Sequence, residues 1–202
     1  QQIILGSETN QDMVCTSGLV EHLSQVVLKT PSNDVATDFC TTVSCFTSKA
    51  SLRYISESPV LEALLNLVGW EGGGPVEGCC RVIAALAQAE PEVLEPMLPK
   101  LVKFLTRALT QHQANVPVLK EALAAALPLV QVESACALFL GCTTAIQKAM
   151  SHRHPDAASM AVRLASQLCK SAGTAQASRE GLQVAEVVQR ALDVLRAHTR
   201  KA

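Results

Sequence analysis

Residues 17–49, SGLVEHLSQVVLKTPSNDVATDFCTTVSCFTSK, align without a gap on residues 58–90, SPVLEALLNLVGWEGGGPVEGCCRVIAALAQAE, at a constant offset of 41 in the numbering. The aligned stretches share their apolar positions, so that Val20 matches Leu61, while most polar positions differ. These apolar residues recur at the spacing of one helix face. A helical unit of about 40 residues cannot bury its apolar face alone and does so by stacking on its neighbours. The repeat therefore predicts an all-α protein, a right-handed α-α superhelix of about four units.

The repeat extends along the whole chain and predicts a single domain. Its expected parts are repeats at about 17–57, 58–95, 96–132 and 133–173, and a capping helix with a polar outer face at 178–200. The period is strict between the first two repeats and drifts in the third, which is rich in proline. Pro128 is predicted to end or kink the long helix that begins at residue 116.

Apolar spacing and turn residues predict local structure in the first two repeats. A helix is expected from residue 34, and the side chains on its buried face are predicted to be Val35, Phe39, Val43 and Phe46. Residues 69–74 contain four glycines and are predicted to form a loop. Pro75 then suits the first turn of the helix that follows.

The composition, 49% hydrophobic with 3% aromatic residues, suits closely packed helices with small aliphatic side chains. No stretch approaches the roughly 18 apolar residues of a membrane span, because the candidate at 122–130 is interrupted by proline. The sequence begins QQIILGSETN, without Met and without the basic start and apolar run of a signal peptide. We expect no membrane partner and a fragment excised from a longer protein.

Eight cysteines lie mostly in apolar helical stretches such as SACALFLGC at 134–142. A helical array of this size does not need disulfides, and the absence of a CxxC pair argues against a zinc or redox centre. We expect reduced thiols in the core. An intracellular protein, cytoplasmic or nuclear, is expected from that chemistry.

The net charge of −1 is unevenly distributed. Residues 1–99 carry 4 Lys or Arg against 12 Asp or Glu, a net charge of −8, whereas residues 100–202 carry 13 against 6, a net charge of +7. This asymmetry favours steering of a charged partner to one end, or head-to-tail association of copies. Scattered basic residues and scarce aromatic side chains argue against nucleic-acid binding.

The string LRYISESP at 52–59, the apolar helix after it and EPEV at 90–93 resemble the armadillo-repeat family. In that family a short helix precedes a Leu-rich second helix and a longer third. The closer match is confined to this stretch, 52–93, and is to the armadillo domain of a meiotic adaptor that dimerises and captures a disordered segment of a DNA-repair partner. The resemblance implies an adaptor that captures a peptide segment, without identifying the partner.

Armadillo domains of the importin type line their groove with Trp and Asn at fixed positions on each third helix, and this chain departs from that pattern. Its one tryptophan, Trp70, is predicted to lie in a loop, and its asparagines Asn33, Asn66 and Asn115 fall outside the long helices. The resemblance therefore does not extend to a nuclear-import receptor.

Catalytic and cofactor motifs do not stand out in the sequence. The stretch GWEGGGPVEG at 69–78 is rich in glycine but lacks the GK[ST] ending of a phosphate-binding loop. His152 and His154 lie near Asp156, but a turn before Pro155 favours surface histidines over metal ligands. We therefore expect no enzymatic activity, no catalytic residue, no metal and no cofactor.

A polar stripe on the third helices of the repeats is the candidate partner-binding surface. The stripe consists of Glu77, Arg81, Gln88, Lys120, Ser159, Arg163 and Lys170. An offset of 82, twice the period, carries the first three members onto the last three. If these helices line a groove, the stripe meets the partner, and its cations favour acidic segments. The alternative is a solvated polar face with no partner.

The predicted function is that of a non-enzymatic protein–protein interaction module, an adaptor or scaffold that captures a segment of another protein along its helical groove. The alternative is a structural self-association domain, which dimerises or joins head to tail through its acidic and basic halves. The expected partner is thus another protein or peptide segment, or a second copy of the chain.

Overall fold

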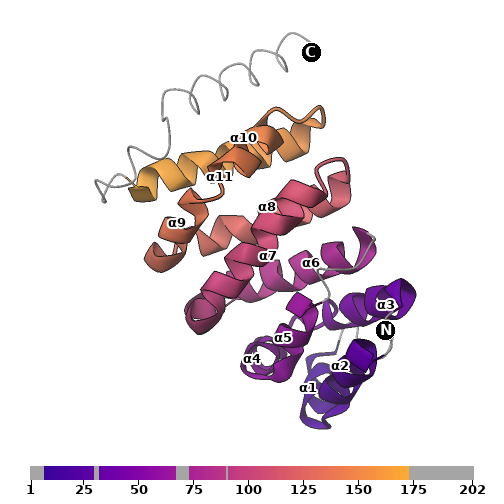
Figure 1. The fold of residues 1–202 in the computed structure, drawn as a ribbon. Coiled ribbons are helices and arrows are strands. Elements are labelled where there is room, and N and C mark those ends of the chain that lie inside the picture. The colour runs from indigo at the N-terminus through magenta and orange to yellow at the C-terminus, as the bar shows by residue number, and fades with distance from the viewer. Residues whose placement is uncertain (1–6, 30–31, 67–72, 90, 173–202) are drawn as a thin grey trace.

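The computed structural model describes residues 7–29, 32–66, 73–89 and 91–172, which form short helices joined by turns (Figure 1). The helices fall into four consecutive units, each with a short first helix. The first unit consists of α1 (Glu8–Thr16), α2 (Leu19–Lys29) and α3 (Asn33–Val43), and the second of α4 (Lys49–Glu57), α5 (Pro59–Asn66) and α6 (Gly73–Ala89). The third consists of the 3-10 helix η2 (Pro91–Met97), α7 (Leu98–Gln111) and α8 (Val116–Leu129), and the fourth of α9 (Glu133–Leu140), α10 (Thr143–Met150) and α11 (Pro155–Ala172).

Equivalent helices of successive units pack against one another. The third helices form one continuous layer, in which α3 contacts α6, α6 contacts α8 and α8 contacts α11 (Figure 1). We call α3, α6, α8 and α11 the third-helix ladder. The second helices α2, α5, α7 and α10 form another layer in the same way. This arrangement confirms the predicted all-α repeat superhelix.

Small side chains let the helices of the ladder approach closely. A Cβ atom placed on Gly78 of α6 would lie only 2.5 Å from the Cβ atom of Cys40 on α3. The ladder also buries a run of alanines, which are Ala122, Ala125 and Ala126 on α8 and Ala157, Ala158, Ala161 and Ala165 on α11. Close packing of helices through glycine and alanine explains how a chain with so few aromatic residues builds a dense core.

The cysteines are free thiols, and most are buried. Cys40 and Cys79 meet at the contact between α3 and α6, with their Sγ atoms 3.4 Å apart. Burial raises the pKa of the Cys79 and Cys80 thiols far above the ordinary value, so these groups stay protonated at neutral pH. They behave as core side chains rather than as nucleophiles.

Helix boundaries agree with the sequence prediction where capping and proline residues mark them. The helix α8 begins after Asn115, whose side chain accepts a hydrogen bond from the backbone N–H of Val118. It ends at Leu129, directly after Pro128, as predicted. Pro75 lies in the first turn of α6, again as predicted.

Two local predictions are wrong. The loop predicted at 69–74 does not include Gly73 and Gly74, which form the first residues of α6, and residues 69–72 lie outside the described part of the chain. Val35, predicted to lie on the buried face of α3, is 37% exposed, because none of the described helices covers that side of α3. The other members of that stripe, Phe39, Val43 and Phe46, are buried.

The third unit is irregular in the way that its prolines require. Its first helix is the 3-10 helix η2, which contains Pro96, and Pro99 lies in the first turn of α7. Proline lacks the backbone N–H that a regular α-helix would use at position 96, whereas the first turn of a helix, where Pro99 lies, does not need it. Trp70 and the predicted capping helix at 178–200 lie outside the described residues, and the repeat limits stay predictions.

A buried polar network joins the first unit to the second. The Gln11 side chain on α1 is 3% exposed, and its Oε1 accepts hydrogen bonds from the backbone N–H groups of Thr47 and Ser48, both at 2.9 Å. Asp12 Oδ1 accepts from the hydroxyls of Ser48 at 2.7 Å and Ser51 at 2.9 Å. Side chains of α1 thus fix the turn that begins α4.

Among the helices that the structure describes, none is both long and apolar enough to cross a membrane.

Candidate functional site

The predicted polar stripe lies on three successive helices of the third-helix ladder, and all seven of its side chains are at least partly exposed. Glu77, Arg81 and Gln88 lie on α6, and Lys120 lies on α8. Ser159, Arg163 and Lys170 lie on α11. Because α8 packs against both α6 and α11, these residues share one layer of the fold (Figure 1).

Arg81 links α6 to α8 through two carboxylates. Its Nη2 atom lies 2.7 Å from Oε1 of Glu77, one helical turn away, and its Nε atom lies 3.5 Å from Oε1 of Glu121 on α8. The guanidinium is therefore neutralised from two sides. The pairs are partly exposed and contribute no more than about 1 kcal/mol each to stability. Their effect is to fix the orientation of the Arg81 side chain.

Lys120 links α8 to α11 in the same manner. Its Nζ atom lies 3.1 Å from Oδ2 of Asp156, at the beginning of α11. The Lys120 ammonium holds the pKa of Asp156 below its ordinary value, first through the hydrogen bond and then through its charge. The carboxylate is thus ionised at neutral pH, and the charge of Lys120 is compensated.

Replacing Lys120 with Met should raise the pKa of Asp156 toward that of an unpaired carboxyl group. Because the folded-state pKa is depressed, the interaction stabilises the fold above the unfolded-state pKa, and this contribution is lost as the pH falls through the folded-state pKa. An NMR titration of the side-chain carboxyl carbon measures the shift. Lys148→Met, at an exposed position on α10, is the matched control; equal Asp156 pKa values in the two variants would contradict the pairing.

Arg163 and Lys170 remain as the uncompensated cations of the stripe. Both are exposed on α11, and no carboxylate of the described residues lies within 4.0 Å of either. Ser159 is exposed on the same helix, one turn before Arg163, and Gln88 is exposed near the end of α6. The structure thus separates the stripe into an internally neutralised centre and a cationic edge.

Neither Glu121 nor Asp156 was predicted from the sequence to neutralise the centre of the stripe, although both do. Their positions follow a simple rule, because each lies about one repeat beyond its cationic partner in the sequence, Glu121 after Arg81 and Asp156 after Lys120. Opposite charges about one period apart on third helices therefore mark contacts across the ladder. A search for that pattern would have found both pairs.

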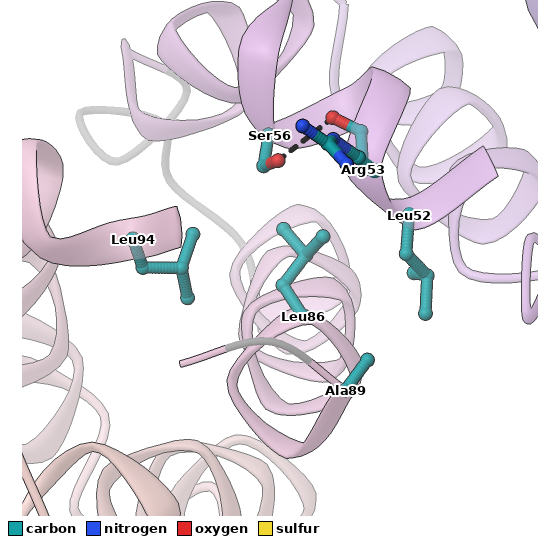
Figure 2. Close-up of a pocket in the computed structure, with 6 residues that line it drawn as sticks. All are labelled: Leu52, Arg53, Ser56, Leu86, Ala89 and Leu94. Carbon is teal, nitrogen blue, oxygen red and sulfur yellow. Dashed lines mark hydrogen bonds between the residues drawn. The ribbon is translucent and has the colours of Figure 1, made fainter. Parts of the chain in front are cut away.

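A hollow where α4, α6 and η2 meet, drawn in Figure 2, holds about 10 Å³, the space of a single water molecule at most. It is lined by Leu52, Arg53, Ser56, Leu86, Ala89 and Leu94. Its serine hydroxyl donates to the backbone carbonyl of Arg53 at 2.7 Å. Within the residues that the structure describes, no group of three His, Cys, Asp or Glu is arranged to hold a metal ion.

Comparison with known proteins identifies the fold. No family model and no curated protein matches the chain. Similar structures have been solved, and three of them each share 18% sequence identity with the chain. An engineered protein from the Northeast Structural Genomics Consortium matches with a TM-score of 0.74, covering 97% of this chain and 87% of its own. A second engineered protein from that consortium matches with a TM-score of 0.68, covering 97% and 88%.

A designed armadillo repeat protein, solved in complex with the peptide (KR)4, matches with a TM-score of 0.69 over 96% of this chain and 88% of its own. Sequence identity at this level establishes the fold alone. The chain has an armadillo-like repeat fold, an all-α superhelix of stacked helical units.

Proposed function

We propose that this chain is a non-enzymatic interaction module of the adaptor class, which captures a segment of a partner protein along the third-helix ladder. The observation that carries the proposal is the ladder itself, a continuous layer of four helices from α3 to α11 with polar side chains at repeat-related positions. The ion pairs of Arg81 and Lys120 orient side chains across successive helices before a partner arrives. Such preorganisation reduces the entropic cost of binding.

Two resemblances support peptide capture. The designed neighbour with the same fold is complexed with the peptide (KR)4. The residues at 52–59 and 90–93 resemble the armadillo domain of heat shock factor two binding protein, which captures a disordered segment of its partner. Free, buried thiols are consistent with the reducing cytoplasm or nucleus, where we place the protein.

Charge along the ladder gives the bound segment a direction. Asp34 and Asp38 are exposed on α3, at the acidic end, whereas Arg163 and Lys170 are exposed on α11. Complementary charges therefore place the basic residues of a partner segment near α3 and its acidic residues near α11. The neutralised centre between them accepts polar groups without a strong preference for charge.

Arg163→Glu should weaken capture of ladder-binding peptides about tenfold, because it replaces an attractive charge with a repulsive one. Peptides selected from a displayed library of random 12-residue sequences against the whole chain provide the probe, and fluorescence anisotropy measures their dissociation constants. Lys148→Glu, on the second-helix layer, makes the same change in net charge and should alter affinity less than about twofold.

Both positions are exposed, so thermal melting should be unchanged in either variant. Equal losses of peptide affinity in the two variants would show that only the net charge of the chain matters, and would contradict capture along the ladder. Arg81→Glu is less informative, because it would place a third carboxylate beside Glu77 and Glu121.

Self-association is the second candidate function, and one observation favours it. Most of the exposed large apolar side chains in the described residues belong to the first unit, namely Met13, Leu19, Val26, Leu28 and Val35. Large apolar side chains that the neighbouring units leave uncovered favour association with another surface. Sedimentation over a range of salt concentrations tests this function, since association through this apolar face should persist in high salt. A monomer under all conditions would exclude it.

A further inference from the structure

An open groove of about 450 Å³ lies outside the third-helix ladder, between α7 and the junction of α9 with α10. The residues that line it are Pro99, Val102, Lys103, Thr106, Arg107, Thr110, Gln111, Leu138, Gly141 and Cys142. None of them belongs to α3, α6, α8 or α11. On the α7 side they recur every three or four residues from one end of the helix to the other, a length of about 18 Å.

The hydroxyl groups in the groove are already satisfied. Thr106 Oγ1 donates to the carbonyl of Val102 at 2.7 Å and lies 2.6 Å from Cys142 Sγ, and Thr110 Oγ1 donates to the carbonyl of Thr106 at 2.6 Å. These bonds fix the inner wall and leave few uncommitted donors there. The donors that face a ligand are therefore the charged ones.

Lys103 and Arg107 form a cationic rim along one side of the groove. Both side chains are exposed, and they lie one helical turn apart, about 6 Å along the axis. The Nε atom of Arg107 donates to Gln111 Oε1 at 2.9 Å, which holds the guanidinium along the helix. Within the described residues, no carboxylate lines the groove or lies within 4.0 Å of either cation.

Their neighbour Lys100 shows the contrast. It lies one turn earlier on α7 and is paired with Glu62 of α5 at 2.6 Å. Lys103 and Arg107 thus differ from Lys100, whose charge is compensated by a carboxylate of another helix.

Leu138 forms the opposite wall and is 38% exposed, the sole large apolar side chain outside the first unit with such exposure among the described residues. Next to it Gly141 opens the groove, because a Cβ atom there would meet only the carbonyl oxygen of Leu138, at 3.4 Å. The groove therefore pairs an apolar wall with a cationic rim.

We infer that this groove is a second docking site, which binds an acidic protein segment carrying an apolar anchor. The anchor covers Leu138, and two carboxylates reach Lys103 and Arg107. Carboxylates two residues apart in an extended segment are about 7 Å apart, and those one turn apart on a helix are about 6 Å apart, so either conformation matches the rim. A pure polyanion would satisfy the rim and leave the apolar wall uncovered.

Two variants of the whole chain test the site with the same displayed 12-residue library. Selected peptides should carry at least two Asp or Glu residues and an apolar residue. Lys103→Glu with Arg107→Glu should weaken their binding at least about tenfold, whereas Lys148→Glu with Arg153→Glu, a matched charge change at exposed positions outside the groove, should change it less than about twofold.

Gly141→Phe should fill the groove and weaken the same peptides at least about tenfold, whereas Gly141→Ala should not. The backbone at Gly141 has φ −67°, which any residue adopts, so melting temperature should be unchanged. If the Phe variant fails to fold, Leu138→Glu replaces it, because it puts a negative charge on the apolar wall. Lys148→Glu remains the reference in that case.

The inference would be overturned by a selection without acidic peptides, by full binding to Gly141→Phe or to its Leu138→Glu substitute, or by equal losses in the two charge variants. Displacement of the peptides by a single-stranded oligothymidylate of equal affinity would also overturn it, because the site would then respond to negative charge alone. Arg163→Glu should leave these peptides unaffected, so this site and the ladder are tested separately.

Discussion

Gly78→Ala should lower the free energy of unfolding by about 2–3 kcal/mol, although alanine is ordinarily the better helix former. Gly78 is buried in α6 where that helix meets α3, and an added Cβ atom would lie 2.5 Å from Cys40 Cβ. The obstacle is a side-chain carbon next to the backbone, so no rotamer change can relieve it. The two helices must separate, which weakens packing along the ladder.

A double-mutant cycle isolates that contact. Cys40→Gly removes the obstructing Cβ, so the double variant should be more stable than the sum of the two single losses predicts, by at least about 1 kcal/mol. Urea unfolding followed by circular dichroism gives the four values. Gly141→Ala, where the added Cβ makes one ordinary contact, is the control and should change stability by less than about 0.5 kcal/mol. Additive losses in the cycle would show that α3 and α6 do not meet at Gly78.

Gln11→Ala should cost about 1–3 kcal/mol, because it leaves two backbone N–H groups, one of them buried, without their acceptor. These are the groups of Thr47 and Ser48, which precede α4, and the Gln11 side chain is the acceptor for both. The loss should appear in urea unfolding, and amide exchange should accelerate in α1 and at the beginning of α4. The consequence is local because the contact joins only the first two units.

Gln25→Ala on α2 provides the matched control, since that glutamine is exposed. Its stability should remain within about 0.5 kcal/mol of the parent. If the two alanine variants lost equal stability, the buried network between α1 and the α4 cap would contribute nothing to the fold.

The sequence predicts the architecture well because the architecture depends on periodicity. Apolar residues at helical spacing, repeated with a period near 41, determine which faces stack, and Pro128 and Asn115 mark the limits of α8. Val35 shows where periodicity fails. Its spacing matches a buried stripe, but burial also requires a neighbouring element, and none of the described helices covers Val35 on that side.

The candidate site was predictable in position but not in charge state. The period places Arg81, Lys120 and Arg163 on equivalent helices, and the structure puts those helices side by side. Whether each cation is free depends on contacts between units, which a search within single helices does not consider. Glu121 and Asp156 compensate two of the three, and Arg163 keeps its charge exposed.

The α7 groove had no sequence signal of its own. It arises where the second helix of one unit meets the first two helices of the next, so its lining residues come from segments that the whole of α8 separates in the sequence. Lys103 and Arg107 belong to an ordinary amphipathic pattern, and only the absence of a nearby described carboxylate distinguishes them from Lys100.

Photo-crosslinking of a bound peptide tests the role of the third-helix ladder most directly. A benzophenone amino acid is placed at Gln88 or Ser159, both exposed on the ladder, or at Thr144, exposed on α10 as the control. The probe is a selected peptide whose capture survives Gly141→Phe and is weakened by Arg163→Glu. Capture along the ladder predicts covalent attachment from positions 88 and 159, with the acidic end of the peptide joined at 159, and none from 144. Attachment from 144 alone would contradict it.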